Sequence, residues 1–247
     1  MIDEAVGMGR RRGAALFVRN VSAFAGFRFP PEVILLAVRW YLRYGLSYRD
    51  LEELLAERGI VVDHVTLERW VQCFTPILIE ASRPCRSATV SLTAGSSTKP
   101  TGKWPGCFRY VYRAVDQYGQ VIDVFVSIKR AAKPARRFFA SAIGAHGRRR
   151  VVTTDRSPAL ARAIIELVPA AHHDTTQYAN SRVEADHGRL EARLRPMRGL
   201  KRDRTASVVI RGHSFMQNLR RGDYELGVDA LAGLTVAAAF DELAKAI

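Results

Sequence analysis

The chain has 247 residues, which is enough for one large or two small domains with a substantial core. Hydrophobic residues make up 48% of it, and no apolar run is long enough to cross a membrane. The 38 Lys and Arg against 24 Asp and Glu give a net charge of +14. This excess indicates a polyanionic partner, nucleic acid before membrane. A generally basic surface without such a partner is the alternative.

The cysteines and the N-terminus bear on the compartment. Three cysteines, Cys73, Cys85 and Cys107, are odd in number and lack metal-type spacing, so we interpret them as free thiols in a reducing environment. The basic Arg10–Arg12 stretch is not followed by the apolar segment of a signal peptide. Together these features predict a cytoplasmic protein.

Residues 1–23 show no periodicity and are interpreted as a disordered extension. Beyond them, Pro31 suits the first turn of a helix, Gly45 ends that helix, and Ser47 caps the next. Gly59 ends the second helix and Asp63 or His64 begins a third. The predicted helices are Val33–Tyr44, Tyr48–Arg58 and His64–Phe74, within a domain of residues 24–80.

Three short helices separated by glycine turns are typical of a helix-turn-helix, whose third helix enters the major groove of DNA. Trp70 is predicted to lie in the core with Leu67, Val71 and Phe74. The alternative is an ordinary three-helix packing domain. The candidate contacts to bases or phosphates are His64, Thr66, Glu68 and Arg69.

An α/β region follows. Phe108–Val115 and Val121–Ile128 are β-rich and are joined by a hairpin, in which Asp116 is a turn residue rather than a metal ligand. The pattern then predicts a helix at Lys133–Ile143, a strand at Val151–Thr154 and a helix at Ala159–Leu167.

Two carboxylates stand out in this region. Asp155 follows the Val151–Thr154 strand directly, where an α/β sheet commonly presents chemistry. Glu184 lies on an arginine-rich helix and shares a face with His187 and Glu191. Such a pair beside a polyanion suggests a divalent-metal site. His172-His173 has no spaced partners and is interpreted as loop.

The sequence around these carboxylates contains longer motifs. Thr154-Asp155-Arg156, the run Tyr178 to Leu190 (YANSRVEADHGRL) and Arg193 to Gly199 (RLRPMRG) resemble the IS6-type (IS26-like) insertion-sequence transposases. The resemblance covers about residues 24–239, apart from residues 87–106. In that family a lysine usually follows the second aspartate, where this chain has Arg156.

The resemblance implies a ribonuclease-H-like mixed sheet with flanking helices, an Asp-Asp-Glu triad, and Mg²⁺ or Mn²⁺ as cofactor. Asp155 and Glu184 would be its last two members, as catalytic residues and metal ligands. It also implies that a bacterial, nucleoid-associated homodimer cuts and joins double-stranded DNA at its element's ends. The basic residues expected to follow DNA phosphates are Arg156, Arg182, Arg189, Arg193, Arg195, Arg198 and Lys201.

The first aspartate of the triad has no counterpart. No Asp or Glu lies between Ala81 and Val115, and Pro100, Pro105 and several glycines predict a poor central strand. We therefore expect residues 81–107 to be an aberrant linker in which the first strand is lost. The predicted catalytic domain then spans residues 108–225, and residues 226–247 form a C-terminal helix.

A reading-frame change accounts for this departure. The family segment Asp-Arg-Trp-Phe-Val-Asp-Glu-Thr-Tyr-Val-Lys-Val-Ala, written in GC-rich codons and read one base later, gives Thr-Ala-Gly-Ser-Ser-Thr-Lys-Pro-Thr-stop-Lys-Trp-Pro. The chain matches this from Thr93 to Pro105, with Gly102 at the stop. We infer compensating frameshifts before Thr93 and near Gly106. They split the codon of the first catalytic aspartate between Ser97 and Thr98.

The sequence thus predicts a transposase whose catalysis is impaired in this copy. One alternative is a non-catalytic protein that binds the element's ends without cutting them. Another is a decayed product that does not fold stably.

Overall fold

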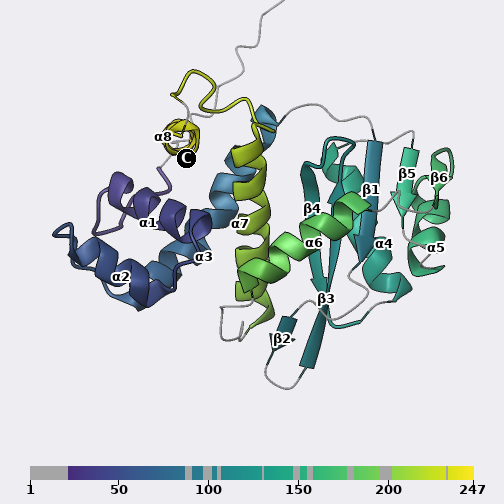
Figure 1. The fold of residues 1–247 in the computed structure, drawn as a ribbon, viewed down its shortest axis with the longest axis horizontal. Helices are drawn as coiled ribbons and strands as arrows, with labels where there is room; N and C mark the ends of the chain where they lie inside the picture. Colours follow the sequence, from purple (N-terminus) through teal and green to yellow (C-terminus); the bar gives the residue numbers. More distant parts are fainter. Residues whose placement is uncertain are drawn as a thin grey trace, which may run out of the picture.

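The computed structural model describes residues 22–86, 91–96, 102–104, 107–129, 131–146, 151–154, 158–176, 181–194, 202–231 and 233–247. Helices α1 to α3 lie on one side of the long helix α7 and the sheet lies on its other side (Figure 1). The helices are α1 Pro31–Arg43, α2 Tyr48–Ala56, α3 His64–Ala81, α4 Ala132–His146, α5 Pro158–Leu167, α6 Ser181–Leu194, α7 Asp203–Arg221 and α8 Thr235–Ala246, with a 3₁₀ turn at Arg83–Cys85. The strands are β1 Ser91–Ser96, β2 Gly102–Trp104, β3 Cys107–Val115, β4 Val121–Ser127, β5 Val151–Thr154 and β6 His172–Asp174.

The three N-terminal helices form where the capping signals predict them. Ser47 and Asp50 make a reciprocal capping box at α2, and the Asp63 carboxylate accepts from two backbone amides at the start of α3. The predicted end of α3 at Phe74 is wrong, because the helix runs through Pro76 to Ala81. Leu78 and Ile79 are buried there, and this burial outweighs the hydrogen bond that proline cannot donate.

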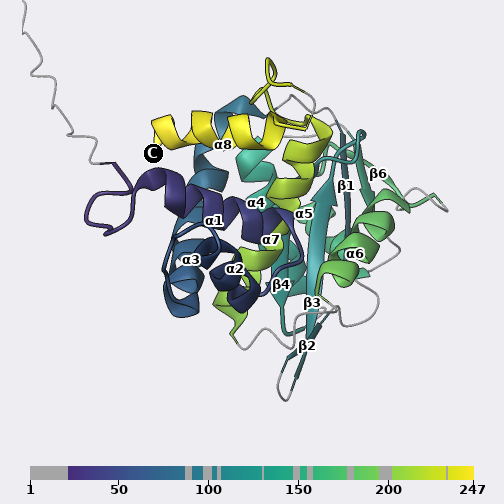
Figure 2. The same ribbon diagram turned by 60° about the vertical axis from the view of Figure 1, so that its left-hand side comes forward.

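The first core joins the N-terminal helices to the C-terminal ones. Buried residues of α1–α3 pack with Phe215 and Leu219 of α7 and with Phe240 of α8. Gly212 lets α7 pack closely against α1, because a Cβ at position 212 would lie 2.6 Å from Leu42 Cδ2 of α1. α8 lies along α1 and also contacts α3 and α7 (Figure 2). The predicted Trp70 core position is confirmed.

The sheet is mixed. Its strand order is β2-β3-β1-β5-β6, with β4 on β3. β3 pairs antiparallel with β1, β2 and β4, whereas β1–β5 and β5–β6 are parallel pairs. The predicted hairpin is confirmed as β3 and β4, and the Asp116 carboxylate accepts from the amides of Tyr118 and Gln120 in its turn. This mixed sheet with flanking helices confirms the α/β, ribonuclease-H-like fold class.

The prediction of a lost first strand is wrong. Residues 91–96 form β1, which lies between β3 and β5 in the middle of the sheet. Alternation explains the strand, since Leu92 and Ala94 are buried on one face. Pro100 and Pro105, which argued against a strand, lie outside β1 and β2 and outside the described residues.

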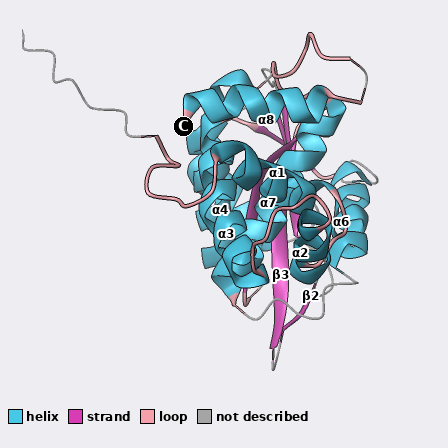
Figure 3. Cartoon of the chain, turned by 90° about the vertical axis from the view of Figure 1, so that its left-hand side faces the viewer, coloured by secondary structure: helices cyan, strands magenta, loops and turns pink. Residues whose placement is uncertain are grey.

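Helices cover both faces of the sheet, and they hide much of it when the molecule is viewed from the helical side (Figure 3). On one face, Leu92, Tyr112 and Val152 form a second core with α4 and α5. On the other, Val111 and Val115 pack under α6 and α7 in a third core. β1 and β3 therefore present alternate residues to two different helical layers.

Two further predictions need correction. His172-His173 lies in the short strand β6 rather than in a loop, because it pairs in parallel with Val151 and Val152 of β5. The C-terminal helix begins at Thr235 rather than at residue 226, and Gly227 and Gly233, both with positive φ, precede it. Within the described residues, no helix is long and apolar enough to span a membrane.

Candidate functional site

The sheet brings the carboxyl ends of β1 and β5 together. Their parallel register runs from Ser91 opposite Val151 to Ala94 opposite Thr154. The Thr154 hydroxyl lies 2.7 Å from Nε2 of His173 on β6, a contact that the sequence analysis did not anticipate. The predicted catalytic Asp155 and its neighbour Arg156 lie outside the described residues. β5 thus ends one residue before the predicted aspartate.

Helix α6 carries the other predicted carboxylate. Val183, Leu190 and Leu194 are buried in the third core, whereas Glu184 and Glu191 are exposed. His187 was expected to share the Glu184 face, but unlike Glu184 it is buried. Burial, reinforced by the nearby Arg113 charge, lowers the pKa of His187 to about 4. Glu184 therefore stands on the solvent side of a helix whose histidine is neutral at pH 7.

A buried ion pair fixes α6 to the sheet. Arg113 of β3 and Asp186 of α6 are almost fully buried, and Arg113 Nε lies 2.7 Å from Asp186 Oδ2. Arg113 Nη2 also donates to the Ser214 hydroxyl of α7 at 2.5 Å. Burial lowers the pKa of Arg113, and the Asp186 charge opposes that shift. Because Asp186 lies two residues after Glu184, this network sets the position of the predicted catalytic helix.

The sequence contains a signal for this network that its analysis missed. Arg113 alternates with Val111 and Val115, so the strand period places it on the inward face, where a lone arginine needs a carboxylate partner.

The neutral His187 gives a pH dependence. In the unfolded chain a histidine takes up its proton near pH 6.5, whereas folded His187 stays neutral down to about 4. Between these values the unfolded state binds more protons, so we expect the free energy of unfolding to fall as the pH is lowered through this window. His213, whose pKa burial lowers to about 3, acts in the same direction. Urea unfolding at pH 7, 6, 5 and 4.5 should show a smaller slope for His187→Asn. Equal slopes would contradict the assignment.

The described residues do not fit a two-cation site. Carboxylates that bridge both cations are needed, and β1 reads Ser-Leu-Thr-Ala-Gly-Ser. Gly95 pairs with Arg113 and so occupies the strand position that faces α6. No cluster of three potential metal ligands occurs within the described ranges. The central strand therefore brings no metal ligand to this face.

The registers of β1 and β2 differ along β3. β1 places Gly95 opposite Arg113, whereas β2 places Gly102 opposite Arg109. Seven residues separate Gly95 from Gly102, whereas four separate Arg113 from Arg109. The two registers are therefore three residues apart, and position 98 is where the sequence analysis places the split aspartate codon.

The predicted DNA contacts of α3 have different surroundings. His64 Nδ1 lies 3.0 Å from a Glu52 carboxylate oxygen, and the Thr66 hydroxyl donates to Asp63 at 2.7 Å. These two side chains hold the start of α3 in place. Glu68 and Arg69 are exposed and make no hydrogen bond or ion pair to another described residue. Arg69 is thus the cation of this set that remains available for a phosphate or base.

The basic residues predicted on and after α6 divide similarly. Arg189 is exposed. The Arg193 guanidinium donates to the carbonyl oxygens of Tyr41 and Tyr44 at the end of α1 and lies over the Tyr41 ring, so it joins α6 to α1. Arg182 lies in α6, but its side chain is outside the described set. Arg195, Arg198 and Lys201 lie wholly outside the described residues.

Comparison with known proteins identifies the class. Residues 101–223 match a family model described as a DDE domain, and this match begins after β1. The chain is 35% identical over 173 residues to the transposase for insertion sequence-like element IS431mec of Staphylococcus aureus, covering 67% of this chain and 75% of the relative. It is 34% identical, with the same coverage, to the transposase for insertion sequence element IS257 in transposon Tn4003 of the same species. The sheet and these matches define a DDE-domain protein.

One similar solved structure is the HTLV-2 integrase catalytic core in complex with magnesium, which is 14% identical in sequence and has a TM-score of 0.38. The match covers 62% of this chain and 95% of that chain. Another is the catalytic core of BIV integrase, with 16% identity, 63% and 95% covered, and a TM-score of 0.40. The chain belongs to the IS6-type family of insertion-sequence transposases.

Proposed function

We propose that this IS6-type transposase binds the ends of its element through α1–α3 but has lost, or nearly lost, metal-dependent strand cleavage and transfer. The observation that carries the proposal is Gly95, which stands opposite Arg113 at the position of the central strand that faces α6. Of the triad that the family resemblance implies, Asp155 and Glu184 remain as candidate ligands, which leaves Mg²⁺ or Mn²⁺ weakly held. A partner of identical sequence is expected, since the family acts on two DNA ends.

The DNA-binding half of the proposal rests on α3 and on charge. α3 begins at a firm N-cap, with Asp63 accepting from the amides of Val65 and Thr66 at 2.9 Å. Arg69 is exposed in the second turn of α3, and the chain carries a net charge of +14. A recognition helix presents its N-terminal turns to base edges while other cations contact phosphates.

Arg69→Ala tests this half of the proposal. We expect binding to a duplex bearing the element's end to weaken by about tenfold or more, the usual result of losing one arginine contact to a base or phosphate. Fluorescence anisotropy at two fixed salt concentrations would measure the dissociation constant, because such binding depends steeply on salt. Arg162→Ala on α5 is the matched control, since Arg162 is exposed and lies outside the three-helix region.

Equal weakening by the two substitutions would show that only overall charge matters and would contradict the role of α3. Cleavage by the unaltered chain in Mg²⁺ or Mn²⁺ would contradict the other half of the proposal. A circular dichroism melt separates both outcomes from the alternative of a chain that does not fold.

A further inference from the structure

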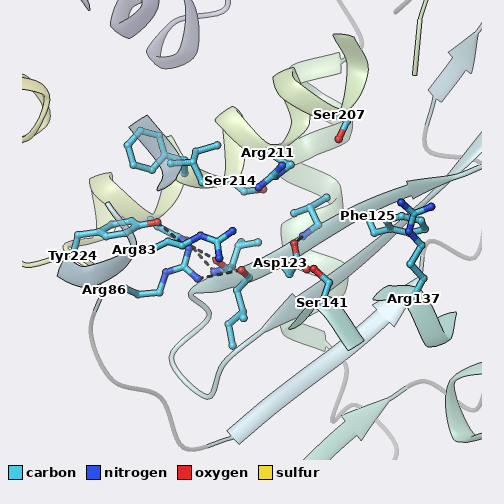
Figure 4. Close-up of a pocket in the computed structure, with 16 residues that line it drawn as sticks. Arg83, Arg86, Asp123, Phe125, Arg137, Ser141, Ser207, Arg211, Ser214 and Tyr224 are labelled. Carbon is cyan, nitrogen blue, oxygen red and sulfur yellow. Dashed lines mark hydrogen bonds between the residues drawn. The ribbon is translucent and has the colours of Figure 1, made fainter. Parts of the chain in front are cut away.

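A cavity of about 480 Å³ lies along the edge strand β4, between α4 and α7. We call it the β4 cavity. Its walls come from the end of α3 and the 3₁₀ turn, from β4, from α4 and from α7. Figure 4 shows Arg83 and Arg86 at one end of it, Arg137 at the other and Arg211 between them. It joins parts of the chain that are far apart in sequence.

The cavity is strongly cationic. Four arginines line it, against one carboxylate, Asp123, so its lining carries a formal excess of three positive charges (4 − 1 = 3). Hydroxyl groups of Ser141 and Ser207 add further donors to the lining. An arginine cluster of this kind repels itself unless an anion or a structural contact balances it.

Structural contacts account for three of the four arginines. Arg83 pairs with Glu80 at 2.9 Å, and Arg137 lies over the Phe125 ring. Arg86 donates to the Ile122 carbonyl and the Tyr224 hydroxyl and so fixes the β4 edge. Arg211 is half-buried, and its side chain makes no hydrogen bond or ion pair to any residue that the structure describes. It is therefore the group whose presence in the cavity the fold itself does not explain.

We propose that the β4 cavity binds a phosphate group and that Arg211 is its central contact. Guanidinium groups bind phosphate with paired, charge-assisted hydrogen bonds. A tetrahedral phosphate directs oxygens to several sides at once, and the donors here stand on α7, on α4 and at the end of α3. A planar carboxylate accepts mainly in one plane through two oxygens, so it matches donors on three sides less well than a tetrahedral phosphate does. The phosphate belongs either to a free ion or nucleotide or to a DNA strand, and in the second case the inference rests on the proposed DNA binding.

The test uses the full chain with inorganic phosphate and AMP as probes, followed by isothermal titration calorimetry. We expect saturable binding by the unaltered protein and an affinity at least about tenfold weaker in Arg211→Gln. Arg162→Gln is the matched control, with the same loss of charge on exposed α5, and it should bind as the unaltered protein does. Equal weakening by both variants, or no saturable binding of either probe, would overturn the proposal. So would binding of a glutamate-rich peptide in preference to phosphate.

A second arm distinguishes the sources of the phosphate. A single-stranded oligonucleotide that displaces AMP from the unaltered protein supports a DNA phosphate, and failure to displace it supports a free ligand in the same site. Arg69→Ala separates this inference from the proposed function. Loss of end binding in Arg69→Ala with AMP binding retained means that the two sites are independent, and the cavity proposal then stands even if α3 does not bind the element's ends.

Discussion

Replacing residues 93–105 with Asp-Arg-Trp-Phe-Val-Asp-Glu-Thr-Tyr-Val-Lys-Val-Ala is expected to restore strand cleavage and transfer. The replacement puts an aspartate at position 98, three residues after Gly95, which pairs with Arg113 in the unaltered chain. We expect the restored first strand to shift by the three residues that separate the β1 and β2 registers, which brings this aspartate opposite Arg113. A carboxylate there faces α6 and supplies the ligand that the described chain lacks. Loss of groups that merely support metal ligands costs 10–100-fold, so we expect restoration to raise the rate by about 100-fold or more. Cleavage of labelled end DNA in Mg²⁺ and Mn²⁺ measures it.

The matched control carries the same replacement with asparagine in place of aspartate at position 98. This control keeps the restored strand and removes only the carboxylate, so it should be as inactive as the unaltered chain. Gly95→Asp in the unaltered chain is a second comparison, because the β1 register puts that position opposite Arg113. Restored activity in the asparagine control would show that the aspartate is not what this copy has lost.

Arg113→Met is expected to give the largest loss of stability of any single substitution considered. It removes the 2.7 Å ion pair of the Asp186 carboxylate, which is 1% exposed, and leaves the longer 3.9 Å contact to Arg221 Nη2. Removing one partner of a buried ion pair costs about 3–5 kcal/mol, against a total stability of about 5–15 kcal/mol for a typical domain. Urea unfolding followed by circular dichroism would measure the change. Asp186→Leu should cause a similar loss of stability, because it leaves the buried Arg113 guanidinium without its carboxylate partner.

The double variant Arg113→Met/Asp186→Leu is the control for this reasoning. Two apolar side chains leave no buried charge unpaired, so the double variant should be more stable than either single one. Strictly additive losses would mean that the pair contributes little beyond packing. Arg109→Met serves as a comparison on the same strand, since its partner Asp203 is half exposed and a smaller loss is expected.

The sequence predicted elements well where local signals act alone. Ser47 and Asp63 marked helix starts, and the β3–β4 hairpin followed from alternation and a turn. Prediction from the sequence failed where contacts between residues far apart in the chain determine the structure. α3 continues past Phe74 because α7 and α8 bury Leu78, and β1 forms because β3 and β5 stand on either side of it.

The candidate site divides in the same way. Glu184 was found from its motif, and its exposure on α6 agrees with an accessible carboxylate. The Arg113–Asp186 pair was missed, because it joins a strand to a helix more than seventy residues away. Arg193 was assigned to DNA from its charge, but its guanidinium binds carbonyl groups of α1, a contact that only the fold creates.

The shared first core has a consequence for how the chain folds as it is synthesised. α1–α3 leave the ribosome early, yet the apolar surface that they bury lies on α7 and α8, at the end of the chain. Until those helices emerge, Leu78, Val38 and their neighbours have no complete partner surface. Release of a truncated chain, or a stop codon in the altered reading frame, would leave that surface exposed to aggregation and proteolysis. Production of the last helix therefore decides the fate of the first three.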